Sequence, residues 1–153
     1  MRVRQIRDPG FENPVYREHV NKIYDFSWSP DGSQIISAAL GDSIRIWDTE
    51  SLQTTKVLEQ GLGRVNAIDW SPQGDRFVVC GAYYIVVRDI ATGDTLLDLT
   101  YKENRRECYD AEFSPDGKKL AYSELFGGIK IFDLENNALL YEMDVEPYER
   151  RVN

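Results

Sequence analysis

The side chains that could do chemistry are few and scattered in this sequence of 153 residues. There is one histidine, His19, which excludes any site that needs two imidazoles. The two cysteines, Cys80 and Cys108, fall at apolar positions of expected strands, where a thiol packs as a small apolar group. The sequence contains no glycine-rich phosphate loop and no ligand pairs at zinc-binding spacing. We therefore expect no enzyme activity, no cofactor and no metal.

The composition is that of a folded domain. Apolar residues make up 42% and charged residues 29%, which excludes a disordered tail, a collagen and a bare coiled coil. The net charge of −8 disfavours general binding to nucleic acid or to an anionic membrane, because both need a basic surface. No run of 18 apolar residues could span a bilayer. With two cysteines, a cytoplasmic location is expected, and a nuclear one stays open.

The chain repeats itself with a period of 42 to 43 residues. Trp-Ser-Pro-Asp-Gly begins at Trp28, Trp-Ser-Pro-Gln-Gly at Trp70 and Phe-Ser-Pro-Asp-Gly at Phe113. In each unit an aromatic residue or arginine, followed by aspartate, comes 18 or 19 residues later. Because two separate marks recur in phase, the sequence indicates three internal repeats.

Each repeat predicts four short strands and no helix. The Ser-Pro turn ends the first strand, since proline fixes φ and glycine supplies a positive φ. The third strand alternates apolar and polar residues, the period of a strand with one buried face. The expected strands are 23–28, 34–38, 44–47 and 54–58, then 65–70, 76–80, 86–88 and 95–99, then 108–113, 119–123, 129–132 and 138–143.

A unit of about 42 residues with four strands and a Trp-Asp pair near its end resembles the WD40 repeat. The resemblance implies an all-β fold of β-propeller blades, each a sheet of four antiparallel strands, with three blades forming a partial ring. The expected parts are an N-terminal extension (1–14), a preceding strand (15–17), blades at about 18–58, 60–101 and 103–145, and the stub of a fourth unit (146–153).

The first repeat is closest to the family pattern, which implies a hydrogen-bonded structural tetrad. Carried over residue by residue, its members are His19, Ser37, Asp42 and Trp47. Asp42 stands one position later than in the family pattern, and Glu18 replaces the family's glycine before the histidine. We expect the tetrad to satisfy buried polar groups rather than to catalyse, because Ser37 would lie inside the blade.

The resemblance also implies where a partner would bind. In propellers the turns between the second and third strands gather at one end of the ring with the connections before the first strands, and loops carry function. The apolar, tyrosine and arginine residues of these segments are typical of interfaces. An alternative is that Tyr84 and Phe126 pack between blades. The expected partner-binding face is Leu40, Arg64, Tyr83, Tyr84, Arg105, Arg106, Leu125 and Phe126.

Two aspartates, Asp25 and Asp110, fall at the same register of the first strands, which line the central channel in propellers. Two carboxylates could hold a cation that prefers oxygen ligands. We favour the alternative that they face water or accept hydrogen bonds from loop amides.

These features predict a non-catalytic scaffold for protein–protein interaction within a larger complex. Propellers typically have four to eight blades, so three cannot close a ring. We expect the missing blades to come from a longer chain, and the alternative is a homodimer of half-propellers with six blades and a structural role. Binding of nucleic acid or phosphate through Arg64, Arg105 and Arg106 is a further alternative, which the negative net charge disfavours.

Overall fold

The computed structural model describes residues 18–41, 43–58, 63–100, 107–125 and 128–143. These residues form strands, turns and bends, and none of them belongs to a helix that could cross a membrane. The strands are β1 (Ile23–Trp28), β2 (Gln34–Ala39), β3 (Ile44–Asp48), β4 (Thr54–Leu58), β5 (Val65–Trp70), β6 (Arg76–Gly81), β7 (Tyr84–Asp89), β8 (Thr95–Asp98), β9 (Cys108–Phe113), β10 (Lys119–Glu124), β11 (Ile129–Asp133) and β12 (Ala138–Met143).

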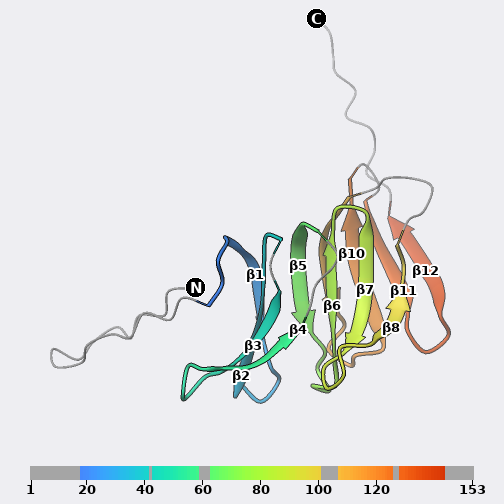
Figure 1. The fold of residues 1–153 in the computed structure, drawn as a ribbon. Coiled ribbons are helices and arrows are strands. Elements are labelled where there is room, and N and C mark those ends of the chain that lie inside the picture. The colour runs from blue at the N-terminus through green and yellow to red at the C-terminus, as the bar shows by residue number, and fades with distance from the viewer. Residues whose placement is uncertain (1–17, 42, 59–62, 101–106, 126–127, 144–153) are drawn as a thin grey trace, which may run out of the picture.

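The twelve strands pair into three antiparallel sheets of four strands, each in chain order. The first sheet is β1 to β4, the second β5 to β8 and the third β9 to β12. Figure 1 shows the three sheets standing side by side in the order of the chain. The predicted fold class, all-β with four-stranded blades, is confirmed.

The Ser-Pro turns between the first two strands of each sheet are held by a serine and an aspartate. The Ser29 hydroxyl donates to Asp31 Oδ1 at 2.6 Å, and Gly32 has a φ of +72°, which favours glycine. In the second sheet a glutamine replaces that aspartate. The Ser71 hydroxyl there donates to Asp75 instead, at 2.8 Å, so the turn keeps a carboxylate acceptor.

The aspartate that ends the third strand of each sheet forms the turn that follows it. Asp48 Oδ1 accepts the backbone N–H three residues later at 2.7 Å, and Asp89 and Asp133 make the same contact at 2.7 and 2.9 Å. An aspartate side chain commonly holds a turn by binding backbone groups two or three residues on. The second mark of the repeat is therefore a turn signal.

The hydrophobic core lies in two layers, one on each side of the second sheet. Phe77 and Val79 pack against the first sheet, while Val78 and Cys80, on the opposite face of β6, pack against the third sheet. These four side chains of β6 are fully buried. The second sheet is thus covered on both faces.

Several expected strand ends differ by one residue, and one expected start differs by two. The third strand of the second repeat was expected at 86–88, but β7 begins two residues earlier, at Tyr84. Gly81 pairs directly with Tyr84, so the turn consists of Ala82 and Tyr83 alone. Neither turn residue is a glycine or asparagine, the usual sequence signals of such a turn.

Candidate functional site

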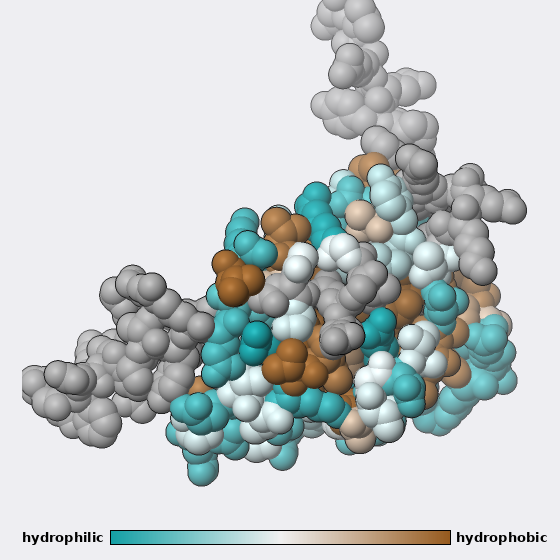
Figure 2. Space-filling model, viewed as in Figure 1, coloured by the Kyte–Doolittle hydropathy of each residue, from teal (hydrophilic) through white to brown (hydrophobic). Residues whose placement is uncertain are grey.

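At one end of the sheets, each turn between the second and third strands is bonded to the residue that leads into the first strand of the same sheet. The turn residue donates its N–H to a carbonyl 18 residues earlier in every repeat. Figure 2 shows hydrophobic atoms at the surface near the upper end of the first two sheets, among hydrophilic ones. The contacts are Leu40 to Lys22 at 3.0 Å, Ala82 to Arg64 at 3.4 Å and Leu125 to Glu107 at 2.8 Å.

Tyr83 is the most unusual residue at this end. Its φ is +79°, a conformation that costs a bulky residue roughly 1–3 kcal/mol. Its side chain is 46% exposed, and Leu40 of the neighbouring turn is 40% exposed. The predicted members Arg105, Arg106 and Phe126 lie outside the described residues.

Tyr84 does not belong to the exposed surface. It is buried in the layer between the first and second sheets, and its hydroxyl donates to the Arg64 carbonyl at 3.1 Å. Tyr84 was predicted to lie on the partner-binding face, but the structure agrees instead with the alternative, in which Tyr84 packs between the sheets. The same carbonyl excludes a side chain at Gly81, where a Cβ would lie 1.9 Å from the Arg64 oxygen.

Arg64 connects the three sheets at this end. Its guanidinium lies 3.4 Å from Glu107, which precedes β9, and 5.7 Å from the ring centre of Tyr24 in β1. The Arg64 side chain is half exposed. It therefore positions neighbouring segments while leaving part of its guanidinium at the surface.

Three members of the expected tetrad meet in the first sheet. His19 Nε2 lies 2.8 Å from Ser37 Oγ, and Trp47 Nε1 donates to the same oxygen at 2.7 Å. All three side chains are buried. Asp42, the fourth member, lies outside the described residues. Buried groups that bind one another in this way stiffen the sheet.

Two cations at the same register of the third strands, in the first and third sheets, each pair with a carboxylate, although the two carboxylates come from different positions. Arg45 lies 3.3 Å from Glu18, and Lys130 lies 3.0 Å from Glu124, whose side chain is fully buried. Burial lowers the pKa of Lys130, but the hydrogen bond and charge of Glu124, with Glu142, outweigh it and raise that pKa. These pairs were not predicted from the sequence.

Carboxylates on the first strands bind the backbone of the next sheet. Asp25 Oδ2 accepts the N–H of Ile68 at 2.9 Å, and Asp69 Oδ2 accepts that of Phe113 at 2.9 Å. Burial raises the pKa of Asp25 although hydrogen bonds from the N–H groups of Ile68 and Phe26 lower it, and the charges of Asp110 and Asp69 raise it further. Asp25 thus accepts a hydrogen bond from a backbone amide, as in the alternative that we favoured, but this amide belongs to a strand of the next sheet and not to a loop. Asp110 accepts the N–H of Ala111 in its own strand.

Neither cysteine has the environment of a nucleophile. Cys80 and Cys108 are buried and free. The Cys108 thiol donates to the Asp110 carbonyl at 3.3 Å, and the neighbouring Cys80 thiol, together with burial, raises the pKa of Cys108. Among the described residues, no group of three or more histidine, cysteine, aspartate or glutamate side chains is arranged to hold a metal ion.

Comparison with known proteins gives one family match and several relatives. The family model for the WD domain, G-beta repeat, matches residues 12–48. The COMPASS component SWD3 of Saccharomyces cerevisiae is 25% identical over 142 residues, which cover 88% of this chain and 45% of that protein. An uncharacterized WD repeat-containing protein of Synechocystis sp. is 34% identical over 77 residues, covering 50% of this chain and 22% of that protein.

A third relative, from Mus musculus, is a subunit of chromatin assembly factor 1. It is 29% identical over 58 residues, or 38% of this chain and 10% of that protein. This chain spans less than half the length of each of these three relatives. The repeat period and the four-stranded antiparallel sheets agree with the matches. The predicted resemblance to the WD40 repeat is confirmed, and the family model places the match at residues 12–48.

Proposed function

We propose that this protein is a non-catalytic WD40 scaffold that binds another protein within a larger complex. The binding site is the turn-end surface, formed among the described residues by Leu40, Arg64, Tyr83 and Leu125. Two relatives carry names of complex members, a COMPASS component and a subunit of chromatin assembly factor 1. The second name also supports the nucleus over the cytoplasm as the location.

The observation that carries the proposal is the conformation of Tyr83. Its φ of +79° would be free of strain for glycine. The Tyr83 side chain extends into solvent for nearly half of its area, so the core does not require it. Tyrosine is enriched among the residues that dominate binding energy in interfaces. A strained, exposed tyrosine at the tip of a pinned turn is therefore best explained by contact with a partner.

The turns that present this surface are rigid. Each is bonded to the segment before the first strand of its sheet, and Arg64 ties three sheets together. A surface that is held in one conformation before binding loses little entropy when a partner docks. The turn-end surface thus suits a preformed docking site.

The test replaces Tyr83 and asks whether a partner is lost while the fold remains. Tyr83→Gly removes the side chain and the backbone strain together, so we expect stability to change by less than about 1 kcal/mol. We expect proteins that co-purify with the wild-type chain to be lost. A photo-crosslinking amino acid at position 83 should join a discrete partner, whereas the same group at Tyr109, an exposed residue of β9, should not.

An unchanged set of co-purifying proteins with Tyr83→Gly would contradict the proposal. So would crosslinks of equal yield from positions 83 and 109. Thermal unfolding of both variants, followed by circular dichroism, shows that any loss of partner is not a loss of fold.

A further inference from the structure

The third sheet exposes positions that the first two sheets bury. Ile44 and Ile85 occupy one register position, four residues before the aspartate that ends the third strand, and both are fully buried. Ile129 occupies that position in the third sheet and is 47% exposed. In the first two sheets this face is covered by the sheet that follows. This side of the third sheet, the third-sheet face, therefore carries side chains of the kind that the other two sheets bury, but none of the described residues covers it.

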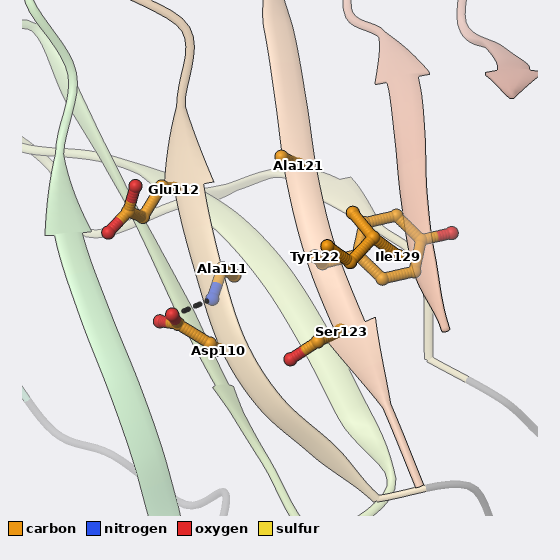
Figure 3. Close-up of a pocket in the computed structure, with 7 residues that line it drawn as sticks. All are labelled: Asp110, Ala111, Glu112, Ala121, Tyr122, Ser123 and Ile129. Atoms are coloured by element: carbon orange, nitrogen blue, oxygen red, sulfur yellow. Dashed lines mark hydrogen bonds between the residues drawn. The ribbon is translucent and has the colours of Figure 1, made fainter. Parts of the chain in front are cut away.

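The third-sheet face is also hollowed. Asp110 and Glu112 project from β9, and Ala121 and Ser123 lie beside them on β10 (Figure 3). Together with Ile129 of β11 they line an open cavity of about 180 Å³. Figure 3 shows both carboxylates extending from the same side of β9.

The two carboxylates occupy positions that bind the next sheet elsewhere in the protein. Asp25 lies three residues before Trp28, and Asp110 lies three residues before Phe113. Asp69 lies immediately before Trp70, as Glu112 does before Phe113. Asp25 and Asp69 each accept a backbone N–H from the following sheet at 2.9 Å. Asp110 and Glu112 are thus placed to accept two such N–H groups.

The first sheet has the complementary face. Phe26 and Trp28 of β1 are 56% and 55% exposed. They occupy the register positions of Ile68 and Trp70, which are buried against the first sheet. The N–H of Ile68 donates to Asp25, and the N–H of Phe113, at the same register as Trp28, donates to Asp69. The first-sheet face therefore carries the donor positions and the apolar side chains that the third-sheet face lacks.

We propose that the third-sheet face binds the first-sheet face of a second copy of this chain. In this head-to-tail contact Glu112 accepts the N–H of Trp28, and Asp110 shares the N–H of Phe26 with the Asp25 carboxylate that this N–H already contacts. Ile129 and Tyr141, which is 64% exposed, become covered by the partner sheet. A heterologous contact of this kind closes into a ring if its rotation allows. Two copies joined at both ends make six blades, which is within the usual range of propellers.

The test measures the mass of the purified chain by light scattering after size exclusion, over a dilution series. We expect twice the 17.6 kDa of one chain. Trp28→Glu and Ile129→Glu each place a charge on one of the two faces, at a position that is exposed in the single chain, and each should give a monomer. Val20→Glu is the matched control, because Val20 is 84% exposed and outside both faces. It should keep the wild-type mass.

Mixing the two face variants separates head-to-tail contact from other pairings. The Trp28→Glu chain keeps an intact third-sheet face, and the Ile129→Glu chain keeps an intact first-sheet face. Equal amounts should therefore recover a particle of two chains. Glu112→Ala removes one acceptor from each of the two interfaces of the ring, so it should raise the dissociation constant at least about a hundredfold, because losing each hydrogen bond to a charged group costs about 1.5 kcal/mol or more.

A wild-type monomer at every concentration would overturn the proposal. So would either face variant that keeps its double mass alone, or a mixture that stays monomeric. Circular dichroism of each variant confirms that the sheets are folded. Tyr83→Gly should leave the mass unchanged, so this proposal and the proposed partner site can fail independently.

Discussion

Asp69 and Phe113 are joined across the boundary between two sheets, where the Asp69 carboxylate accepts the Phe113 N–H at 2.9 Å. The two residues are 44 positions apart, one residue more than the step of 43 between the second and third repeats. The second carboxylate oxygen accepts the Ser27 hydroxyl of the first sheet at 3.0 Å. One side chain of the second sheet therefore connects all three sheets without strand pairing between them.

Removing this acceptor should weaken the packing of the sheets. Asp69→Ala leaves the Phe113 N–H and the Ser27 hydroxyl without their acceptor, so we expect the free energy of unfolding to fall by about 2 kcal/mol. Urea unfolding, monitored by tryptophan fluorescence, measures this free energy of unfolding. Asp69→Asn is the control, because its carbonyl oxygen can still accept the Phe113 N–H, and it should lose less. Equal losses in both variants would contradict an acceptor role.

The Ser37 hydroxyl should contribute to stability through its two partners. Ser37→Ala leaves His19 and the Trp47 indole N–H buried without this partner, at a cost of about 2 kcal/mol. Thr95→Ala is the control, because Thr95 is an exposed hydroxyl residue of β8 outside both proposed faces, and it should cost under about 0.5 kcal/mol. Urea unfolding compares the two variants. A Ser37→Ala protein as stable as the Thr95→Ala protein would show that the hydrogen bonds add nothing.

The buried Glu124–Lys130 pair should show strong coupling. Glu124→Leu leaves the Lys130 ammonium buried without its nearer carboxylate and should cost about 3 kcal/mol. Adding Lys130→Met removes the unpaired charge and should recover most of that loss, since apolar replacements of a buried pair are often neutral. A double-mutant cycle by urea unfolding gives the coupling energy. Additive effects of the two substitutions would mean that the pair is not coupled.

Acid should destabilise the protein through its turn aspartates. Hydrogen bonds from Ser29 and Ser33 lower the pKa of Asp31 to about 2. A carboxyl whose pKa is lower in the folded than in the unfolded state stabilises the fold above the unfolded pKa, and this is lost as pH falls through the folded pKa. The carboxyls with a lowered pKa are Asp31, Asp48, Asp89, Asp116 and Asp133.

The urea midpoint should therefore fall as pH decreases from about 4 to about 2. Asp25 opposes this trend. Because its pKa is raised in the folded state, its contribution to stability is present at low pH and is lost as pH rises through the folded pKa. It is one carboxyl against five, so the net effect of acid remains destabilising. Asp31→Asn should make the midpoint less sensitive to pH in this range. A midpoint that rises on acidification would contradict the assignment.

Most strand positions could be predicted because characteristic turn residues mark where the strands of each repeat end. The ranges 23–28, 65–70 and 108–113 coincide with β1, β5 and β9, since the Ser-Pro turn fixes where each of these strands ends. The start of β7 could not be predicted, because Tyr83 adopts a positive φ that sequence signals reserve for glycine or asparagine. Tertiary contacts, not local preference, determine that turn.

The contacts between sheets were beyond the sequence. The role of Asp69, the contact between Cys80 and Cys108 and the Glu124–Lys130 pair depend on which faces of neighbouring sheets meet. The repeat alignment does place Asp69 and Glu112 at one register, which is the signal that could have found the inter-sheet acceptors. The tetrad members could be named because the family pattern specifies their spacing.

The double coverage of β6 has a consequence for how the chain opens. Its backbone is paired with β5 on one side and β7 on the other, and its side chains are buried on both faces. Each outer sheet can separate from the middle one while the other stays attached, whereas β6 is released when both have left. Amide hydrogens of β6 should therefore exchange with deuterium more slowly than those of β4 or β12, and a single chain should open from its two outer sheets toward its centre.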